Sequence, residues 1–204
     1  MTDLDKALGD IRSIRRQMAR STEFRGYGPL TLVSTGVLAI IAASIQAYWF
    51  RYGRLHPVRF VSLWAITALL SAALIALQTL TRAHRLHSGM ADEMIHLAAG
   101  QFLPAAIAGA LLTFTLVHFA PFTLWMLPGL WQIAYSLGIF ASCRFLPRPM
   151  LAAGVWYLLT GLACLSLAGP RALSPWMMGV PFALGQGLIA LILFLNAEEG
   201  HHEA

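Results

Sequence analysis

One sixteen-residue stretch of this sequence concentrates side chains that can bind a metal ion. It reads TRAHRLHSGMADEMIH and covers residues 81–96. His84 and His87 are three residues apart, and His96 lies three residues after Glu93 and four after Asp92. On a helix such pairs share one face, and imidazole and carboxylate groups are ligands for zinc or iron. The pattern therefore offers a metal site made of His84, His87, Asp92, Glu93 and His96.

The electrostatics of helix ends explain the same stretch more simply. Arg82 and Arg85 stand where a helix would end, and cations are favoured at that end. Gly89 is a helix-stopping residue, and Asp92 and Glu93 would then lie in the first turns of the next helix, where anions are favoured. We therefore favour a turn between two helices over a metal site.

Two further kinds of site chemistry fit the sequence poorly. A b-type haem needs two facing ligands, but His96 and His118 stand at opposite ends of one apolar run, roughly 33 Å apart on a helix. An intramembrane serine protease needs an activated serine, and the nearest motif, AYSLG at 134–138, lacks both flanking glycines and a partner histidine. We expect no cofactor, with a metal or a single-ligand haem as the remaining alternative, and we expect no enzymatic activity.

The composition indicates a protein that crosses a membrane several times. Of the 204 residues, 58% are hydrophobic and 11% are charged, against about 25% charged in soluble domains. No acidic residue lies between Glu23 and Asp92, or between Glu93 and Glu198. Long apolar tracts joined by short basic segments are typical of polytopic membrane proteins, so the lipid bilayer is the first expected partner. The basic pI then requires no nucleic acid, and we expect no direct binding to one.

The apolar tracts predict the fold class. It is an all-α polytopic membrane helical bundle with six transmembrane helices, preceded by a short cytoplasmic amphipathic helix. Each tract is long enough to cross about 30 Å of hydrocarbon at about 1.5 Å per residue. The expected organisation is a cytoplasmic N-terminal helix at 1–28, the bundle at 29–196 and a cytoplasmic tail at 197–204. The six spans are expected at 30–50, 60–80, 97–120, 122–143, 149–169 and 175–196.

The distribution of lysine and arginine predicts the orientation of the bundle. With the N-terminus in the cytoplasm, the inner segments carry ten of these residues and the outer connections carry four. Because positive charge is retained on the cytoplasmic side, both termini are expected to lie in the cytoplasm.

The polar residues within the spans suggest either structural bonds or a path for a solute. Glutamines recur at Gln46, Gln78, Gln101, Gln132 and Gln186. Buried amides usually form hydrogen bonds between helices, which is the interpretation we favour. The alternative is a path for a small neutral or lipophilic solute, lined by Gln101, Gln132 and Gln186 beside spans that contain proline. No Asp, Glu, Lys or Arg lies within any predicted span, which argues against an ion-coupled carrier.

Small residues and prolines predict how the spans pack. Small side chains recur every four residues and would allow close approach of helices. Pro104, Pro128 and Pro181 lie inside predicted spans and are expected to kink them. The small-residue stripes are Ala68, Ala72 and Ala76; Ala105, Gly109 and Thr113; and Ala134, Gly138 and Ser142.

The N-terminal segment LDKALGDIRSIRRQM carries an apolar seam. Its apolar residues are spaced by three and four positions, which predicts an amphipathic helix with its arginines off the seam. Such a helix can lie on the anionic leaflet, pair with its copy in a homodimer, or dock a cytoplasmic protein. The residues expected to carry docking are Leu4, Ile11, Arg12, Ile14, Arg15, Arg16 and Met18.

The run IRSIRRQMARSTEFRGYGPL, leading into an apolar tract, resembles the head of small bacterial six-span inner-membrane proteins. The resemblance is clearest over residues 10–45 and is mainly topological beyond them. Proteins of that group are often encoded beside winged-helix regulators. The resemblance implies a bacterial inner membrane and a regulatory partner, and it supplies no catalytic residue. We therefore expect a non-enzymatic sensing or partner-docking membrane module, with a solute facilitator as the alternative and a metal or haem protein as the third.

Overall fold

The computed structural model describes residues 28–52, 57–86, 89–143, 147–167 and 169–202. Side chains are described for the same ranges except 50–52, 57, 80, 82–86, 89–99, 170 and 197–202. Within these ranges all regular secondary structure is helical. The elements are α2 Pro29–Tyr52, α3 Pro57–Leu86, α4 Gly89–Phe119, η1 Pro121–Met126, α5 Leu127–Ser142, α6 Met150–Ser166, η2 Gly169–Leu173 and α7 Trp176–His202.

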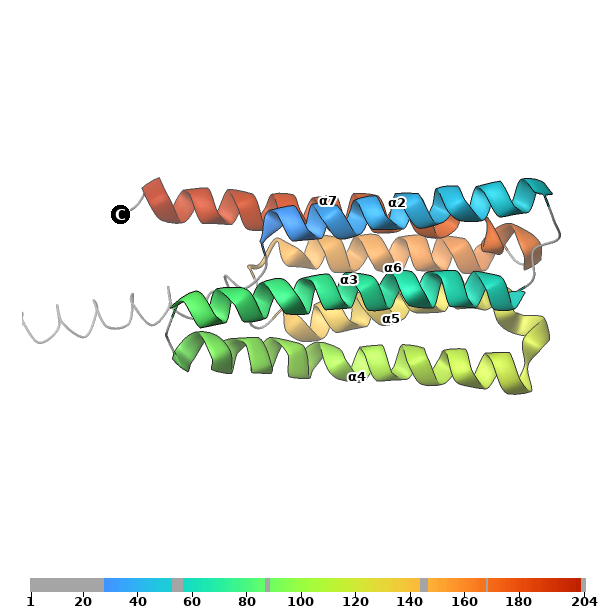
Figure 1. Cartoon of the computed structure of the whole chain (residues 1–204), viewed down its shortest axis with the longest axis horizontal. Coiled ribbons are helices and arrows are strands. Elements are labelled where there is room, and N and C mark those ends of the chain that lie inside the picture. The colour runs from blue at the N-terminus through green and yellow to red at the C-terminus, as the bar shows by residue number, and fades with distance from the viewer. Residues whose placement is uncertain (1–27, 53–56, 87–88, 144–146, 168, 203–204) are drawn as a thin grey trace, which may run out of the picture.

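The long helices lie side by side along one axis, and successive helices run in opposite directions (Figure 1). Each helix from α2 to α7 packs against the next one along the chain, and α7 returns to pack against α2. The short 3-10 helices η1 and η2 lie together at one end of the bundle, which we call the loop end (Figure 1). The C-terminus lies at the opposite end, which we call the C-terminal end.

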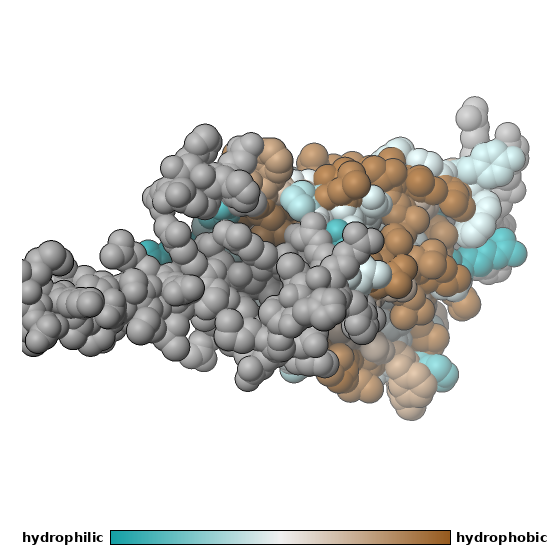
Figure 2. Space-filling model, turned by 60° about the vertical axis from the view of Figure 1, so that its left-hand side comes forward, coloured by the Kyte–Doolittle hydropathy of each residue, from teal (hydrophilic) through white to brown (hydrophobic). Residues whose placement is uncertain are grey.

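Five helical segments are long and apolar enough to cross a membrane, and α6 is a shorter apolar helix of 17 residues. The outward-facing side chains are largely apolar, and the described atoms on the face in Figure 2 are mostly hydrophobic. An exposed apolar surface of this extent is stable only in contact with hydrocarbon. The chain is therefore a helical membrane bundle.

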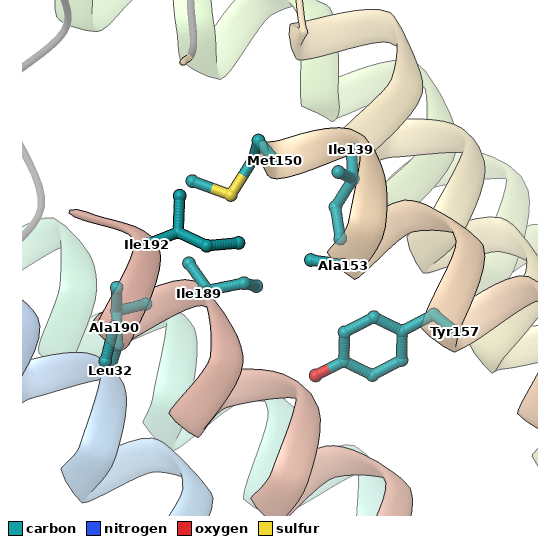
Figure 3. Packing of buried hydrophobic residues seen from close by; sticks show 8 residues of the cluster. All are labelled: Leu32, Ile139, Met150, Ala153, Tyr157, Ile189, Ala190 and Ile192. Carbon is teal, nitrogen blue, oxygen red and sulfur yellow. The ribbon is translucent and has the colours of Figure 1, made fainter. Parts of the chain in front are cut away.

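Two clusters of buried apolar residues fill the interior. One lies at the loop end and contains Ala39, Ala42 and Ala43 of α2 with Phe60 and Trp64 of α3. The other joins α2, α5, α6 and α7. In Figure 3, Ile189 and Ile192 of α7 point toward α6, while Ala190 lies against α2. Helix α7 thus packs against α6 on one side and α2 on the other.

Glycine permits the closest helix contact, between α5 and α6. A Cβ atom added to Gly161 would lie 2.9 Å from the carbonyl oxygen of Gly129, and one added to Gly129 would lie 2.7 Å from that of Gly161. Any larger side chain would push the two backbones apart. Close backbone approach of this kind is how helices gain association energy in lipid.

The predicted spans and the observed helices differ in two places. Pro128 was expected to kink a span, but the chain forms η1 first, and Pro128 stands in the first turn of α5. Proline is tolerated there because the first N–H groups of a helix have no partner within it. The alanine stripe of α3 was expected to pack against another helix, but Ala68, Ala72 and Ala76 are all exposed.

The predicted break between the second and third spans lies where α3 ends at Leu86 and α4 begins at Gly89. The expected N-terminal helix at 1–28 lies outside the described residues, apart from Gly28.

Candidate functional site: the polar core of the bundle

The structure separates the three glutamines of the proposed solute path. Gln132 on α5 and Gln186 on α7 are buried in the bundle, whereas Gln101 on α4 is exposed. The side chains of the proposed metal site, His84, His87, Asp92, Glu93 and His96, lie outside those described. So do the docking residues Leu4, Ile11, Arg12, Ile14, Arg15, Arg16 and Met18.

Gln132 satisfies a carbonyl group that a proline leaves without its usual partner. Pro181 lies inside α7 and has no N–H to donate to the carbonyl oxygen of Met177, four residues earlier. Gln132 Nε2 donates to that oxygen at 2.8 Å and also lies 3.8 Å from Met178 Sδ. The amide of one helix thus completes the backbone hydrogen bonding of another, as an apolar surrounding requires.

Two residues of α6 bond to the same turn of α7. Trp156 Nε1 donates to the carbonyl oxygen of Pro181 at 2.9 Å, and Tyr157 Oη donates to that of Phe182 at 3.5 Å. Because Gln132 reaches this turn from α5, the Pro181 turn is held by side-chain donors from two helices. These bonds fix the position of α7 near its N-terminal end, within its first two turns.

Aromatic rings surround the next polar contact along α7. Gln186 Nε2 donates to Tyr135 Oη at 2.8 Å. The ring of Tyr135 makes edge contacts with Tyr157, Phe182 and Phe102, at centroid distances of 4.7, 5.6 and 5.2 Å. Edge-to-face geometry of this kind is the favourable arrangement of aromatic pairs. Four helices, α4 to α7, therefore meet around one amide.

At the loop end, Gln46 joins three parts of the chain. Its Nε2 donates to the carbonyl oxygen of Leu173 in η2 at 2.8 Å, and its Oε1 accepts from Trp64 Nε1 at 2.7 Å. Both ends of the amide are thus used. On the neighbouring helices, Trp131 Nε1 donates to Thr113 Oγ1 at 2.8 Å, while its ring stacks on Phe60 at 6.1 Å.

The expectation that glutamines bond between helices is confirmed at Gln46, Gln78, Gln132 and Gln186. Gln78 Oε1 accepts from the backbone N–H of Gly28 at 3.3 Å. Ser136, the serine of AYSLG, is buried and donates to the carbonyl oxygen of Gly154 at 2.8 Å. These residues hold helices together.

Two acceptors in this polar core have no hydrogen-bond donor among the described residues: Gln132 Oε1 and Gln186 Oε1. Buried amide oxygens usually have a partner, so these two are exceptions within the bundle. The two lie on different helices, 54 positions apart in sequence (186 minus 132).

Metal-ligating side chains are not gathered in the described part of the chain. There, no group of three or more His, Cys, Asp or Glu is placed to hold a metal ion. Cys143 and Cys164 are free thiols. His118 Nδ1 lies 3.1 Å from the carbonyl oxygen of Phe114 on its own helix.

Sequence reasoning found the glutamines but missed their partners. Tyr135, the partner of Gln186, was not identified, and neither were Trp156 and Tyr157, which bond to the backbone of α7, because aromatic residues in an apolar tract have no distinguishing spacing. Pro181 was the sequence signal that could have indicated these bonds, because a proline inside a span frees a carbonyl group that needs a donor from another helix.

Comparisons of the chain with protein-family models, with curated proteins and with solved structures find no match.

Proposed function

We propose that this chain is a non-enzymatic module of the bacterial inner membrane that docks a cytoplasmic regulatory protein through its N-terminal amphipathic helix. In this proposal the bundle has six spans, with α6 as the fifth along the chain, and both termini lie in the cytoplasm. The bundle anchors and orients the docking helix.

The observation that carries the proposal is that polar side chains inside the bundle form hydrogen bonds to the backbone of neighbouring elements. Gln46, Gln132 and Trp156 each donate to a backbone carbonyl of another element, at 2.8 to 2.9 Å. Ser136 does the same from α5 to α6. Side chains engaged in this way stabilise a fixed bundle, which is what an anchor requires.

The charges support the proposed orientation. Arg171 follows α6 at the loop end, and Arg148 precedes it at the other end. The loop end is the side poor in basic residues, and the six lysine and arginine residues before the first span belong with the opposite side. The anionic inner leaflet would attract the basic face of the N-terminal helix and leave its apolar seam to a partner.

The test is a crosslinking pull-down from bacterial membranes with the full chain and three variants. Deletion of residues 1–20, and the seam variant Ile11→Ser with Ile14→Ser, should abolish recovery of a cytoplasmic protein. Ser13→Ala, on the other side of the same helix, is the matched control and should leave recovery unchanged. Recovery that survives both the deletion and the seam variant would remove the proposal.

One observation favours a second function, a facilitator for a small neutral solute. Gln132 Oε1 and Gln186 Oε1 are buried acceptors without a described donor, so a neutral solute that reached them could donate hydrogen bonds to both. In liposomes, Gln132→Leu with Gln186→Leu should then lower the flux of a small neutral solute such as glycerol. Gln101→Leu is the matched control, because its side chain lies on the exposed face of α4. Flux equal to that of protein-free liposomes would exclude glycerol as the solute.

A further inference from the structure

Helix α4 is the least covered helix of the bundle. No residue of Gly100–Phe119 is buried. The residues that face α5, such as Ala105 and Gly109, are half-buried, and the rest of the helix is exposed. In a membrane this exposed surface meets either lipid or another protein.

The polar side chains on that exposed surface follow one line. The spacings along it are three and four residues, so its members form a single stripe on the helix. All of them are exposed, and none carries a formal charge with histidine neutral. The α4 stripe consists of Gln101, Pro104, Ala108, Leu111, Thr115 and His118.

Two side chains of the α4 stripe have no hydrogen-bond partner in the described part of the chain: Gln101 and Thr115. Other exposed hydroxyl groups are satisfied within their own helices. Ser34 and Ser44 of α2 donate to the carbonyl oxygen four residues earlier, at 2.9 and 2.8 Å. Thr115 makes no such bond, although its own helix offers the same acceptor. Polar groups that face hydrocarbon without a partner are unfavourable.

The proline of the α4 stripe removes the usual donor of one backbone carbonyl. Pro104 has no N–H to donate to the carbonyl oxygen of Gly100, and no described side chain donates to that oxygen. The other proline inside a helix, Pro181, shows how this chain meets the same requirement, because Gln132 from a neighbouring helix donates to the freed oxygen at 2.8 Å. At Pro104 the nearest glutamine, Gln101, lies on the exposed face.

We propose that the α4 stripe is the interface of a parallel homodimer, in which α4 of one copy packs against α4 of a second copy. All copies insert in the same direction, so each residue of the stripe meets its own counterpart near a two-fold axis. Gln101 has both a donor and an acceptor, so it can pair with Gln101 of the second copy or donate to the freed Gly100 oxygen.

The chemistry of the stripe favours a second copy as the occupant. The hydroxyl group of Thr115 is also both donor and acceptor, and it pairs with itself across the same axis. No charge in the stripe repels a copy, and Ala108 between the two polar positions permits close approach. The alternating spacing of three and four keeps both polar positions in contact at a crossing angle of about 20°.

The decisive experiment is oxidative crosslinking in native membranes. The background is the full chain with Cys143→Ser and Cys164→Ser, which removes both free thiols. In this background Ala108→Cys should give a disulfide-linked dimer. Ala106→Cys is the matched control, because it is an exposed alanine of the same helix that points about 160° away from Ala108, and it should stay monomeric. A monomer at position 108, or equal dimer at both positions, would overturn the proposal.

A second experiment tests the polar groups themselves. Single-molecule photobleaching in dilute liposomes should show that Gln101→Leu with Thr115→Val weakens dimerisation by about tenfold or more, as the loss of several interhelical hydrogen bonds implies. Ser34→Ala with Ser44→Ala, which removes self-bonded exposed hydroxyls, should leave dimerisation unchanged. Circular dichroism checks that all variants fold. Unchanged dimerisation in the stripe variant would overturn the proposal, and another membrane protein at the stripe would give monomers in liposomes.

Discussion

The side-chain amide of Gln132 donates to the carbonyl oxygen of Met177, the one backbone acceptor of α7 from which Pro181 withholds its usual donor. A proline on one helix and a glutamine on another thus act as a pair. Without Gln132, Pro181 would leave the Met177 carbonyl group without a hydrogen-bond donor inside an apolar bundle.

This pairing predicts a coupled effect on stability. Gln132→Leu should lower the free energy of unfolding by about 1–2 kcal/mol, because the Met177 oxygen loses its partner. Pro181→Ala restores the backbone N–H, so the double variant should be more stable than Gln132→Leu alone. Thermal unfolding in detergent measures both changes as a double-mutant cycle. Additive effects of the two substitutions would show that the pair is not coupled.

The contact of Gly129 with Gly161 predicts that one methyl group added at this point will destabilise the bundle. Gly161→Ala places a Cβ atom 2.9 Å from the Gly129 oxygen and should destabilise the bundle by about 1–3 kcal/mol. Gly187→Ala is the control, since no atom lies within 4 Å of its added Cβ. There the gain in helix propensity should leave stability unchanged or raised by about 0.5–1 kcal/mol. Equal melting temperatures for the two variants would contradict the close packing of α5 and α6.

Trp64 is expected to contribute more to stability through its N–H than the exposed Trp176 does. Trp64→Phe keeps most of the ring but leaves Gln46 Oε1 without its donor at a buried position. We expect a loss of about 1–2 kcal/mol. Trp176 is 47% exposed, so Trp176→Phe should change the unfolding free energy little. Chemical unfolding followed by far-ultraviolet circular dichroism separates the two outcomes.

The two cysteines should differ in reactivity and report the orientation of the bundle. Cys143 is half-buried at the C-terminal end of α5, whereas Cys164 is 1% exposed. In the proposed orientation, a membrane-impermeant maleimide should label Cys143 from the cytoplasmic side and label Cys164 only after denaturation. Labelling of Cys143 in inverted membrane vesicles but not in intact spheroplasts checks both points, with Cys143→Ser as the blank. The reverse pattern would place the C-terminal end outside.

The helices could be predicted from the sequence, but their neighbours could not. Each predicted span overlaps a helix from α2 to α7, because long apolar tracts without charge have few other stable forms in a membrane. The fourth span, however, begins with the 3-10 helix η1, and α6 is shorter than the five helical segments that are long enough to cross a membrane. It was harder to predict which face of each helix packs against another helix and which is exposed. Ala68, Ala72 and Ala76 were expected to pack and are exposed. Lipid is as apolar as the bundle interior, so hydrophobic periodicity does not distinguish the two surfaces.

The polar core was partly predictable for the same physical reason. A glutamine in an apolar span must find a partner, which made hydrogen bonds at Gln46, Gln132 and Gln186 a sound expectation. Which group each amide reaches depends on how helices distant in sequence are arranged. The bonds of Gln132 and Gln186 join α5 with α7, and that of Gln46 joins α2 with η2, pairings that no local sequence pattern encodes.

The contacts of α2 with η2 and α7, at the far end of the chain, also bear on how the protein is made. Gln46 and its acceptor Leu173 are 127 residues apart, a distance that a ribosome covers in on the order of ten seconds. During that interval Gln46 Nε2 lacks its final acceptor, although Gln46 Oε1 can already accept from Trp64 of α3. The ring of helices therefore closes only after its last helix has been translated and inserted.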